Sequence, residues 1–136
     1  MRGAAALFWL LLASPALAQE APVCPFPGQT PKLVVQVFFG QNTAAHALVS
    51  RRAWQRFVAD TITPALPNGF TIYDAYGQYL DKRTGSIGRE ATEVLVVAAD
   101  DTPEFRARVA ALTEAYRRRF DQISVGILTS LGCGVF

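Results

Sequence analysis

Strand-like and helix-like segments follow one another along the 136-residue chain in an order that leaves few possible folds. Segments rich in β-branched and aromatic residues predict strands, and apolar residues that recur every three or four positions predict helices. The expected strands are residues 32–39, 70–79, 87–98 and 124–129, and the expected helices begin after Ser50 and Thr102. The order is therefore strand, helix, strand, strand, helix, strand.

This β-α-β-β-α-β order predicts an α+β fold, a ferredoxin-like sandwich with a four-stranded antiparallel sheet and both helices on one face. Right-handed crossovers place the first and third strands in the centre and the fourth strand beside the first. Ser50 and Thr102 are good helix caps, and Pro103 suits a first helical position. Apolar stripes that include Trp54 and Phe105 predict the helix faces that pack on the sheet.

The first 18 residues have the pattern of an export signal. Arg2 gives a positive start, residues 4–12 are apolar, and small residues at 16–18 form a cleavage site. The apolar run is too short to span a bilayer as a helix. We therefore expect a signal peptide at 1–18, a proline-rich extended arm at 19–32 and a single domain at 33–136. The mature protein should be periplasmic or secreted, with no membrane anchor after cleavage.

Two cysteines, Cys24 and Cys133, lie near opposite ends of the chain. A single pair in an oxidising compartment favours one disulfide. The predicted topology independently brings the start of the first strand beside the end of the fourth. Lipidation of Cys24 is the alternative, but Val23 precedes it where lipoprotein signals have a small residue, and Glu20 interrupts the approach. We therefore expect a Cys24–Cys133 disulfide.

The charge balance and the residue types exclude several classes of function. The formal net charge is +2 at pH 7, whereas a nucleic-acid binder or a polybasic membrane anchor carries a one-sided excess of Lys and Arg. Ser124, Thr129 and Ser130 have no base nearby, and the single histidine, His46, has no cluster of metal ligands around it. We expect no cofactor and no metal, and an enzyme is the less favoured class.

Short motifs spread over the predicted domain carry a family resemblance. They are Phe39-Gly40, Trp54, Phe57, Thr63-Pro64, Asp74, Gly77-Gln78-Tyr79, Arg89-Glu90, Thr92, Tyr116, Phe120 and Ser124-Val125. With them, the chain from Phe38 to Val125 resembles a family of short exported bacterial proteins, the domain of unknown function 3574. Its most specific part is the Gly-Gln-aromatic run followed by Arg-Glu. The resemblance supports export and the fold class, and it implies no activity.

The predicted central hairpin concentrates polar side chains on one face. With its turn centred between residues 83 and 84, Gln78 lies opposite Arg89 and Asp74 lies opposite Glu93. One face then carries Ile72, Asp74, Tyr76, Gln78, Arg89, Glu93 and Leu95. The other carries Thr71, Tyr73, Ala75, Thr92, Val94 and Val96. The second set suits packing under helices, so we expect the first face to be open.

The candidate ligand or interface face is Asp74, Tyr76, Gln78, Arg89 and Glu93. Large apolar groups beside converging charges are found in small-ligand sites, and the alternatives are a solvated face or a different register. We predict an exported module that binds a small molecule, a peptide or itself through the open sheet face. The alternative is a small dimeric ferredoxin-like enzyme acting on a small organic substrate. The expected homodimer would pair through this face and dissociate on Tyr76→Glu; the rival is a monomer whose arm covers the sheet.

Overall fold

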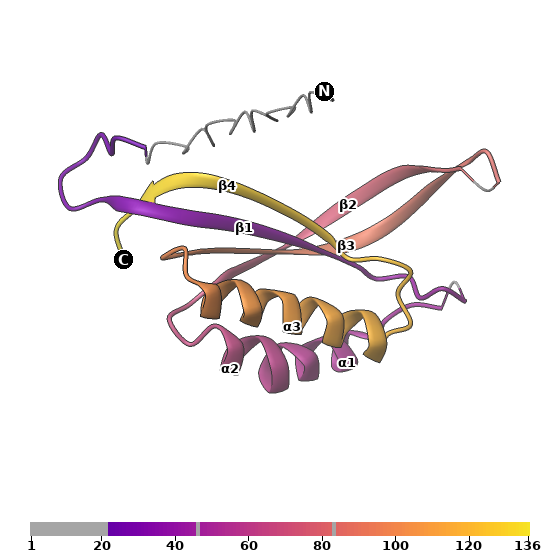
Figure 1. Ribbon diagram of the computed structural model, residues 1–136. Helices are drawn as coiled ribbons and strands as arrows, with labels where there is room; N and C mark the ends of the chain where they lie inside the picture. Colours follow the sequence, from indigo (N-terminus) through magenta and orange to yellow (C-terminus); the bar gives the residue numbers. More distant parts are fainter. Residues whose placement is uncertain (1–21, 46, 83) are drawn as a thin grey trace, which may run out of the picture.

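The computed structural model describes residues 22–45, 47–82 and 84–136. The predicted signal peptide and His46 lie outside the described residues. The elements are β1 (Thr30–Gly40), α1 (Arg51–Phe57), the π-helical turn η1 (Val58–Ile62), α2 (Thr63–Ala65), β2 (Thr71–Asp81), β3 (Ser86–Ala99), α3 (Pro103–Arg119) and β4 (Gly126–Gly134). Their order confirms the predicted α+β fold with a four-stranded antiparallel sheet (Figure 1).

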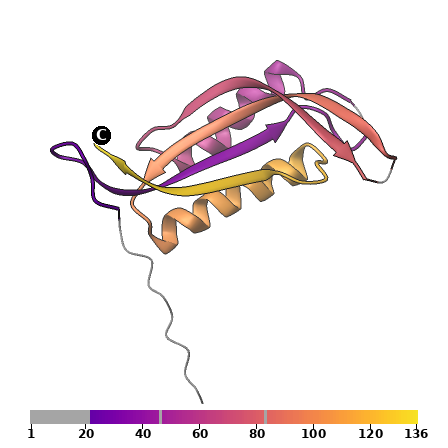
Figure 2. The ribbon, with the colours of Figure 1, turned by 90° about the horizontal axis from the view of Figure 1, so that it is seen from above.

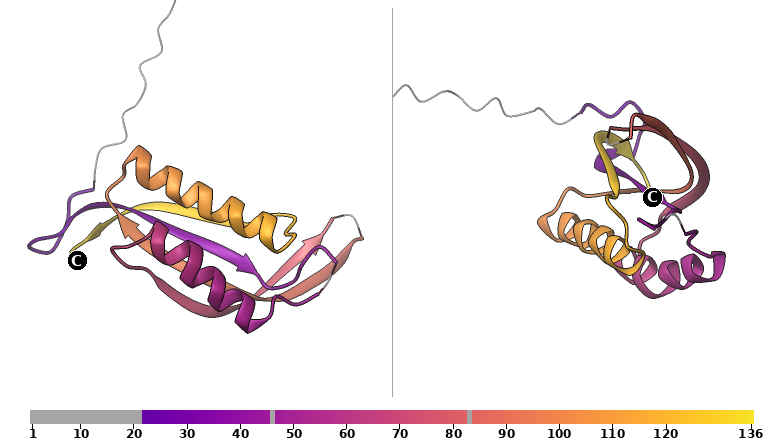
Figure 3. Two further views of the ribbon diagram at one scale, coloured as in Figure 1. Left: turned by 90° about the horizontal axis from the view of Figure 1, so that it is seen from below. Right: turned by 90° about the vertical axis from the view of Figure 1, so that its right-hand side faces the viewer.

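The strands lie in the order β2-β3-β1-β4, so that β1 and β3 are central. Figure 3 shows α3 side by side with the α1–α2 segment on one face of the sheet, the covered face. Figure 2 shows the opposite face, which carries neither helix, the uncovered face. The distal half of the β2–β3 hairpin extends beyond the ends of both helices (Figure 1). The sheet therefore has a supported half and a projecting half.

An aromatic cluster forms the centre of the core. Phe39 of β1 meets Trp54 and Phe57 of α1 and Tyr116 of α3, with ring centroids from 4.7 to 6.1 Å apart. Tilted and edge-to-face pairs of this kind add about 0.5–1.5 kcal/mol each beyond the apolar area that they bury. The other buried core residues are Val35, Val37, Ile62, Leu66, Leu95, Val97, Phe105, Val109 and Leu112. Both predicted helix stripes thus pack on the covered face.

The first helix continues through Pro64, a residue type that usually ends a helix. Thr63 has helical backbone angles, φ −56° and ψ −47°, and its N–H bonds to Val58 five residues earlier. Proline lacks an N–H and its ring clashes with the carbonyl four residues before it. The wider π turn immediately precedes Pro64, so the helix reaches Ala65 and buries Ile62 on the way. The π turn thus lets the helix pass a proline that would clash with a regular α-helical turn.

The second helix, α3, begins and ends as its sequence suggests. The Thr102 side chain accepts a hydrogen bond from the Phe105 N–H at 3.1 Å, and Pro103 is the first helical residue. At the other end Asp121 adopts a left-handed φ of 47°, and the Gln122 N–H bonds to the Arg117 carbonyl at 2.9 Å. This is a Schellman-type ending with aspartate in place of the usual glycine. In the described part of the chain, no helix is long and apolar enough to cross a membrane.

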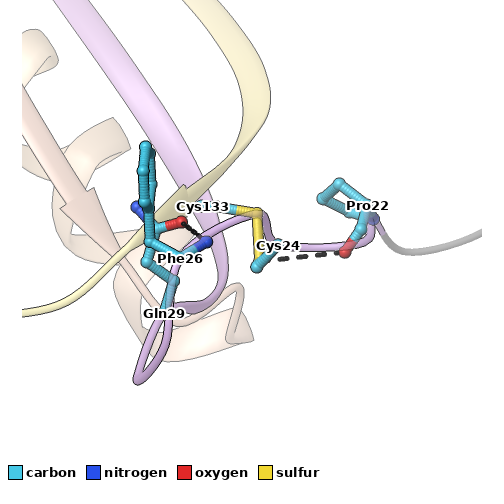
Figure 4. The surroundings of a disulfide bond; sticks show 5 residues. All are labelled: Pro22, Cys24, Phe26, Gln29 and Cys133. Atoms are coloured by element: carbon cyan, nitrogen blue, oxygen red, sulfur yellow. Dashed lines mark hydrogen bonds between the residues drawn. A yellow bond between two sulfur atoms is a disulfide. The ribbon is translucent and has the colours of Figure 1, made fainter.

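The predicted disulfide joins the first and last parts of the described chain. Cys24 and Cys133 are bonded, with Cα atoms 5.5 Å apart (Figure 4). The arm reverses direction at Phe26–Gln29, where Pro27 and Gly28, with φ +80°, occupy the positions that a type II turn favours. The strand β1 begins at Thr30, so the last three residues of the expected arm belong to the sheet. Pairing of Thr30 with Gly134 then brings the cysteines together.

Candidate functional site

The predicted register of the hairpin is confirmed, but the predicted open face is wrong. Asp74 lies opposite Glu93 and Gln78 opposite Arg89, as expected. However, Leu95 of the same face is fully buried in the core beneath the helices. Period two therefore places the whole candidate set, Asp74, Tyr76, Gln78, Arg89 and Glu93, on the covered face.

The error has a simple physical reason. The sequence suggested that a face with several charges would be open to water. In the structure the helices cover only the inner end of that face, where Ile72, Leu95 and Val97 pack in or against the core. The charged residues lie farther along the same face. Asp74 and Glu93 are beside the start of α1, and Arg89 is on the projecting half of the hairpin, so water reaches all three although they are on the covered face. The charged residues therefore indicated which end of the face is open to water, and they did not indicate which face the helices cover.

Asp74 and Glu93 line a hollow of about 400 Å³ between the hairpin and the start of α1. Its other walls are Gln41, Leu48, Val49, Arg51, Trp54, Gln55 and Ala91. Burial raises the pKa of Glu93, the Asp74 carboxyl adds to the rise by its charge and a hydrogen bond, and Arg51 opposes it. A hydrogen bond between two opposed carboxyls needs a proton on one of them, and the raised pKa of Glu93 favours such a bond. These two members of the predicted set do converge.

The remaining members of the predicted set lie apart from this pair. The Arg89 Nε donates to the Gln78 Oε1 at 3.2 Å, and both residues are exposed on the projecting half of the hairpin. The Tyr76 side chain is 69% exposed. The predicted face thus divides into a carboxyl pair beside α1 and a polar, open stretch on the hairpin. It does not form one site.

A second site lies on the uncovered face, and residue-by-residue reasoning from the sequence missed it. Two adjoining hollows of about 300 and 390 Å³ share Tyr79, Glu90, Gln122 and Ser124 as walls. We call them together the uncovered-face groove. The larger hollow is completed by Asn42, Thr43, Ala44, Leu80, Asp81, Lys82 and Ile123, and the smaller by Phe38, Gly40, Ala75, Tyr76, Gly77, Gln78, Thr92 and Gly126.

Glu90 is the acidic group that both hollows of the groove share. Its carboxylate lies flat against Gly40, where an added Cβ would be only 2.7 Å from Oε2. Its strand partner is also a glycine, Gly77, and an added Cβ there would be 3.2 Å from the Thr92 hydroxyl. Within the described residues, no hydrogen bond or ion pair holds the half-buried Glu90 carboxylate. Gly40 therefore makes room for a carboxylate that is open to the groove, and Gly77 makes room for the neighbouring Thr92 hydroxyl.

Tyr79 supplies the aromatic wall. Its strand partner is Gly88, and a Cβ added at Gly88 would lie 2.6 Å from the tyrosine Cζ. The ring consequently lies across the bare glycine backbone, a cross-strand arrangement known to support exposed glycines in sheets. Gly88 thus sets the position of Tyr79 as Gly40 sets that of Glu90.

The opposite wall is fixed by hydrogen bonds from the end of α3. The Gln122 Nε2 donates to the Asn42 carbonyl at 3.0 Å, and the Ala44 N–H donates to the Asp121 carbonyl at 2.9 Å. Below them, the Tyr116 hydroxyl donates to the Gly40 carbonyl at 2.8 Å. Burial raises the pKa of that phenol, so it is a neutral donor at physiological pH. The left-handed backbone of Asp121 thereby turns the chain after α3 so that residues 122–124 form this wall of the groove.

Several residues of the family motifs line the groove. Gly77, Gln78, Tyr79 and Glu90 of these motifs, together with Gly40, Thr92 and Ser124, supply much of its lining. In the described ranges, no three His, Cys, Asp or Glu side chains lie close enough to hold a metal ion. The groove offers a carboxylate, amides, hydroxyls and an aromatic ring, which are binding groups.

A family model described as "Protein of unknown function (DUF3574)" matches residues 35–136. The chain belongs to this family. The match agrees with the resemblance that the sequence motifs indicated. No curated protein matches the chain.

Solved structures show the same fold as this DUF3574 protein at low sequence identity. A phage SAM lyase in complex with S-methyl-5'-thioadenosine has a TM-score of 0.57 and 17% identity, over 77% of this chain and 90% of that one. CutA1 from Oryza sativa has a TM-score of 0.51 and 18% identity, over 80% of this chain and 86% of that one. At these identities, the comparisons support the ferredoxin-like fold alone.

Proposed function

We propose that this protein is an exported binding module that holds a small organic molecule in the uncovered-face groove. The observation that carries the proposal is Glu90, a half-buried carboxylate without a hydrogen bond or ion pair within the described residues. Its carboxylate oxygens remain open to the groove, so a ligand can replace the water that solvates them. A ligand that donates hydrogen bonds or carries a positive charge would satisfy the carboxylate at this position.

The other walls define what such a ligand must contain. Tyr79 offers one ring for stacking or a cation–π contact, and Gln122 and Ser124 are the polar residues of the far wall. Hollows of about 300 and 390 Å³ lie at the lower end of the size range of ligand pockets. We infer a ligand that has a flat or cationic group for Tyr79 and N–H or O–H donors for Glu90.

The expected location supports a binding function outside the cytoplasm. The signal pattern at residues 1–18 predicts export, and the Cys24–Cys133 disulfide agrees with an oxidising compartment. The groove lies away from the disulfide, because Glu90 and Tyr79 belong to the projecting half of the hairpin. Locking the ends of the chain therefore leaves the groove free to adjust to a ligand.

Thermal shift of the purified mature protein against a panel of small molecules tests the proposal. S-methyl-5'-thioadenosine is the first probe, because it is present in the complex of the phage SAM lyase, and it combines a flat base with hydroxyl donors. Amines and amino acids complete the panel. For any molecule that raises the melting temperature, Glu90→Gln should weaken binding about tenfold or more, since a hydrogen bond to a charged group contributes about 1.5–3 kcal/mol.

Glu93→Gln is the matched control, because it makes the same change three residues along the same strand but on the opposite face. It should leave the binding constant unchanged. Tyr79→Ala should weaken the binding of aromatic or cationic ligands. A ligand whose affinity drops for Glu93→Gln and not for Glu90→Gln would place binding at the hollow beside α1 and contradict the proposed site.

The enzyme alternative has one specific observation in its favour. Glu93, with its raised pKa, lies beside its strand partner Asp74 in the wall of a hollow of about 400 Å³. A carboxyl whose pKa is raised, next to a second carboxyl, is the kind of pair from which enzymes build a general acid and a general base. A turnover found in substrate screens that is lost in both Glu93→Gln and Asp74→Asn, and kept in Glu90→Gln, would favour this alternative.

A further inference from the structure

The edge strand β4 is exposed in three directions. Its only strand partner in the described sheet is β1. On the uncovered face the Leu128 side chain is 55% exposed. On the covered face Ile127 and Leu131 are still 49% and 43% exposed, and neither belongs to the core. The strand thus has a free edge with apolar side chains on both of its faces.

The sequence of β4 does nothing to protect this edge. Residues Gly126–Gly134 contain no charged residue and no proline. Natural edge strands avoid pairing with other chains by means of charged side chains, prolines, bulges or covering segments. The other edge strand of the same sheet, β2, carries Asp74 and Asp81. One edge of the sheet is therefore guarded, and the other has the features of a pairing surface.

The strand is also held ready in extended form. It pairs with β1 from Thr30 opposite Gly134 to Phe38 opposite Gly126. The Cys24–Cys133 disulfide fixes the last residues of β4 against the arm. On the uncovered face Phe38 and Val34 of β1 lean over Gly126 and Gly132, at 3.4 and 3.1 Å from where a Cβ would stand. Because β4 is already extended and held in place, a partner that pairs with it loses little conformational entropy.

We propose that a second copy of this chain pairs with β4 in antiparallel fashion, about a two-fold axis at Thr129. In this register Ile127 lies opposite Leu131 of the second copy, and the same contact repeats on the other side of the axis. Thr129 lies opposite its own equivalent, and threonine pairs are favourable across antiparallel strands. On the uncovered face the two copies of Leu128 are diagonal neighbours. The sheet continues through both copies.

The pattern of β4 selects a copy of itself as the partner. An isologous interface needs a surface that is complementary to itself under a two-fold rotation. Ile127 and Leu131 are equally spaced about Thr129, so rotation brings apolar groups onto apolar groups. With no charge in the strand, rotation also brings no like charges together. A charged peptide would gain nothing from this edge beyond its backbone hydrogen bonds.

Light scattering of the mature protein over a concentration series, with residue 129 as the probe, tests the pairing. The wild-type protein should have the mass of two chains. Thr129→Lys places two ammonium groups face to face and should halve the mass at the same concentration. Thr129→Val is the matched control, because it keeps the β-branched shape without charge, and it should remain dimeric. Circular dichroism and a non-reducing mass measurement verify the fold and the disulfide of each variant.

Mixing the Thr129→Lys protein with a Thr129→Glu protein tests the register itself. Each variant should be monomeric alone, and the mixture should recover the mass of two chains, because opposite charges then face each other at the axis. A wild-type mass of one chain at every concentration would overturn the pairing and leave the edge to some other protein's strand. A Thr129→Lys dimer, or a mixture that stays monomeric, would equally overturn it.

Discussion

The supported and projecting halves of the β2–β3 hairpin belong to the same two strands but differ in almost every physical respect. In the supported half Val94 and Leu95 are essentially inaccessible to water. In the projecting half Tyr76, Tyr79, Leu80 and Ile87 are each about half exposed or more. Stability is therefore concentrated where β3 meets β1 and the helices, and side chains able to contact a ligand are concentrated where the hairpin leaves them.

The largest expected effect is in the supported half. Trp54→Ala or Phe105→Ala should each lower the free energy of unfolding by about 3–5 kcal/mol, because both rings are buried in the core. Tyr76→Ala on the projecting half should change it by no more than about 0.5 kcal/mol. Chemical denaturation followed by circular dichroism measures all three. Equal losses for Trp54 and Tyr76 would show that the hairpin is not divided in this way.

Removal of the disulfide should come next in size. Replacing Cys24 and Cys133 by serine opens a loop of 109 residues and should cost about 2–5 kcal/mol. The lost stability comes from the β1–β4 side of the sheet, where the bond lies, and not from the projecting half of the hairpin. Ligand binding in the uncovered-face groove should be retained below the new melting temperature. If binding disappeared while circular dichroism stayed native, the groove and the disulfide would be coupled.

A smaller effect should come from the carboxyl pair at the boundary between the halves. Because burial and Asp74 raise the pKa of Glu93, the folded protein holds this proton more tightly than the unfolded chain does. The contribution of Glu93 to the free energy of unfolding is fully present at pH values below its pKa in the unfolded chain. It is lost as the pH rises through its pKa in the folded protein. Glu93→Gln should therefore stabilise the protein at neutral pH, by less than about 1 kcal/mol because water reaches the pair.

Melting temperatures from pH 4 to pH 8 test this assignment. The wild-type curve should fall with rising pH more steeply than that of Glu93→Gln. Asp74→Asn should move the fall toward lower pH, because it takes away the charge that helps to raise the pKa of Glu93. A Glu93→Gln curve parallel to the wild-type curve would show that Glu93 titrates alike in the folded and unfolded states.

The smallest effect is expected at Tyr76, where the sequence predicted a dimer contact. The side chain lies on the projecting hairpin, which belongs to the opposite side of the sheet from β4. Tyr76→Glu should leave the mass in solution unchanged, whereas Thr129→Lys should change it. Dissociation by Tyr76→Glu would return the interface to the hairpin.

Local patterns were enough to predict the order of the strands and main helices and the hairpin register, and the predicted topology then supported the disulfide. A helix cap such as Thr102 and a cross-strand pair such as Asp74–Glu93 depend on short-range chemistry and on a period of two. The covered face could not be read in the same way, because period two separates two sets of side chains without saying which meets the helices. The groove was harder still, since Gly40, Tyr79, Glu90 and Gln122 come from separate segments.

The bond between Cys24 and Cys133 also turns the described domain into a covalent ring. A protease that cuts the exposed hairpin turn once would leave both pieces attached, so that only reduction would separate them on a gel. The same closeness of the two ends makes the turn between Asp81 and Ser86 a suitable place to open a circularly permuted chain, with the old ends joined by a short linker.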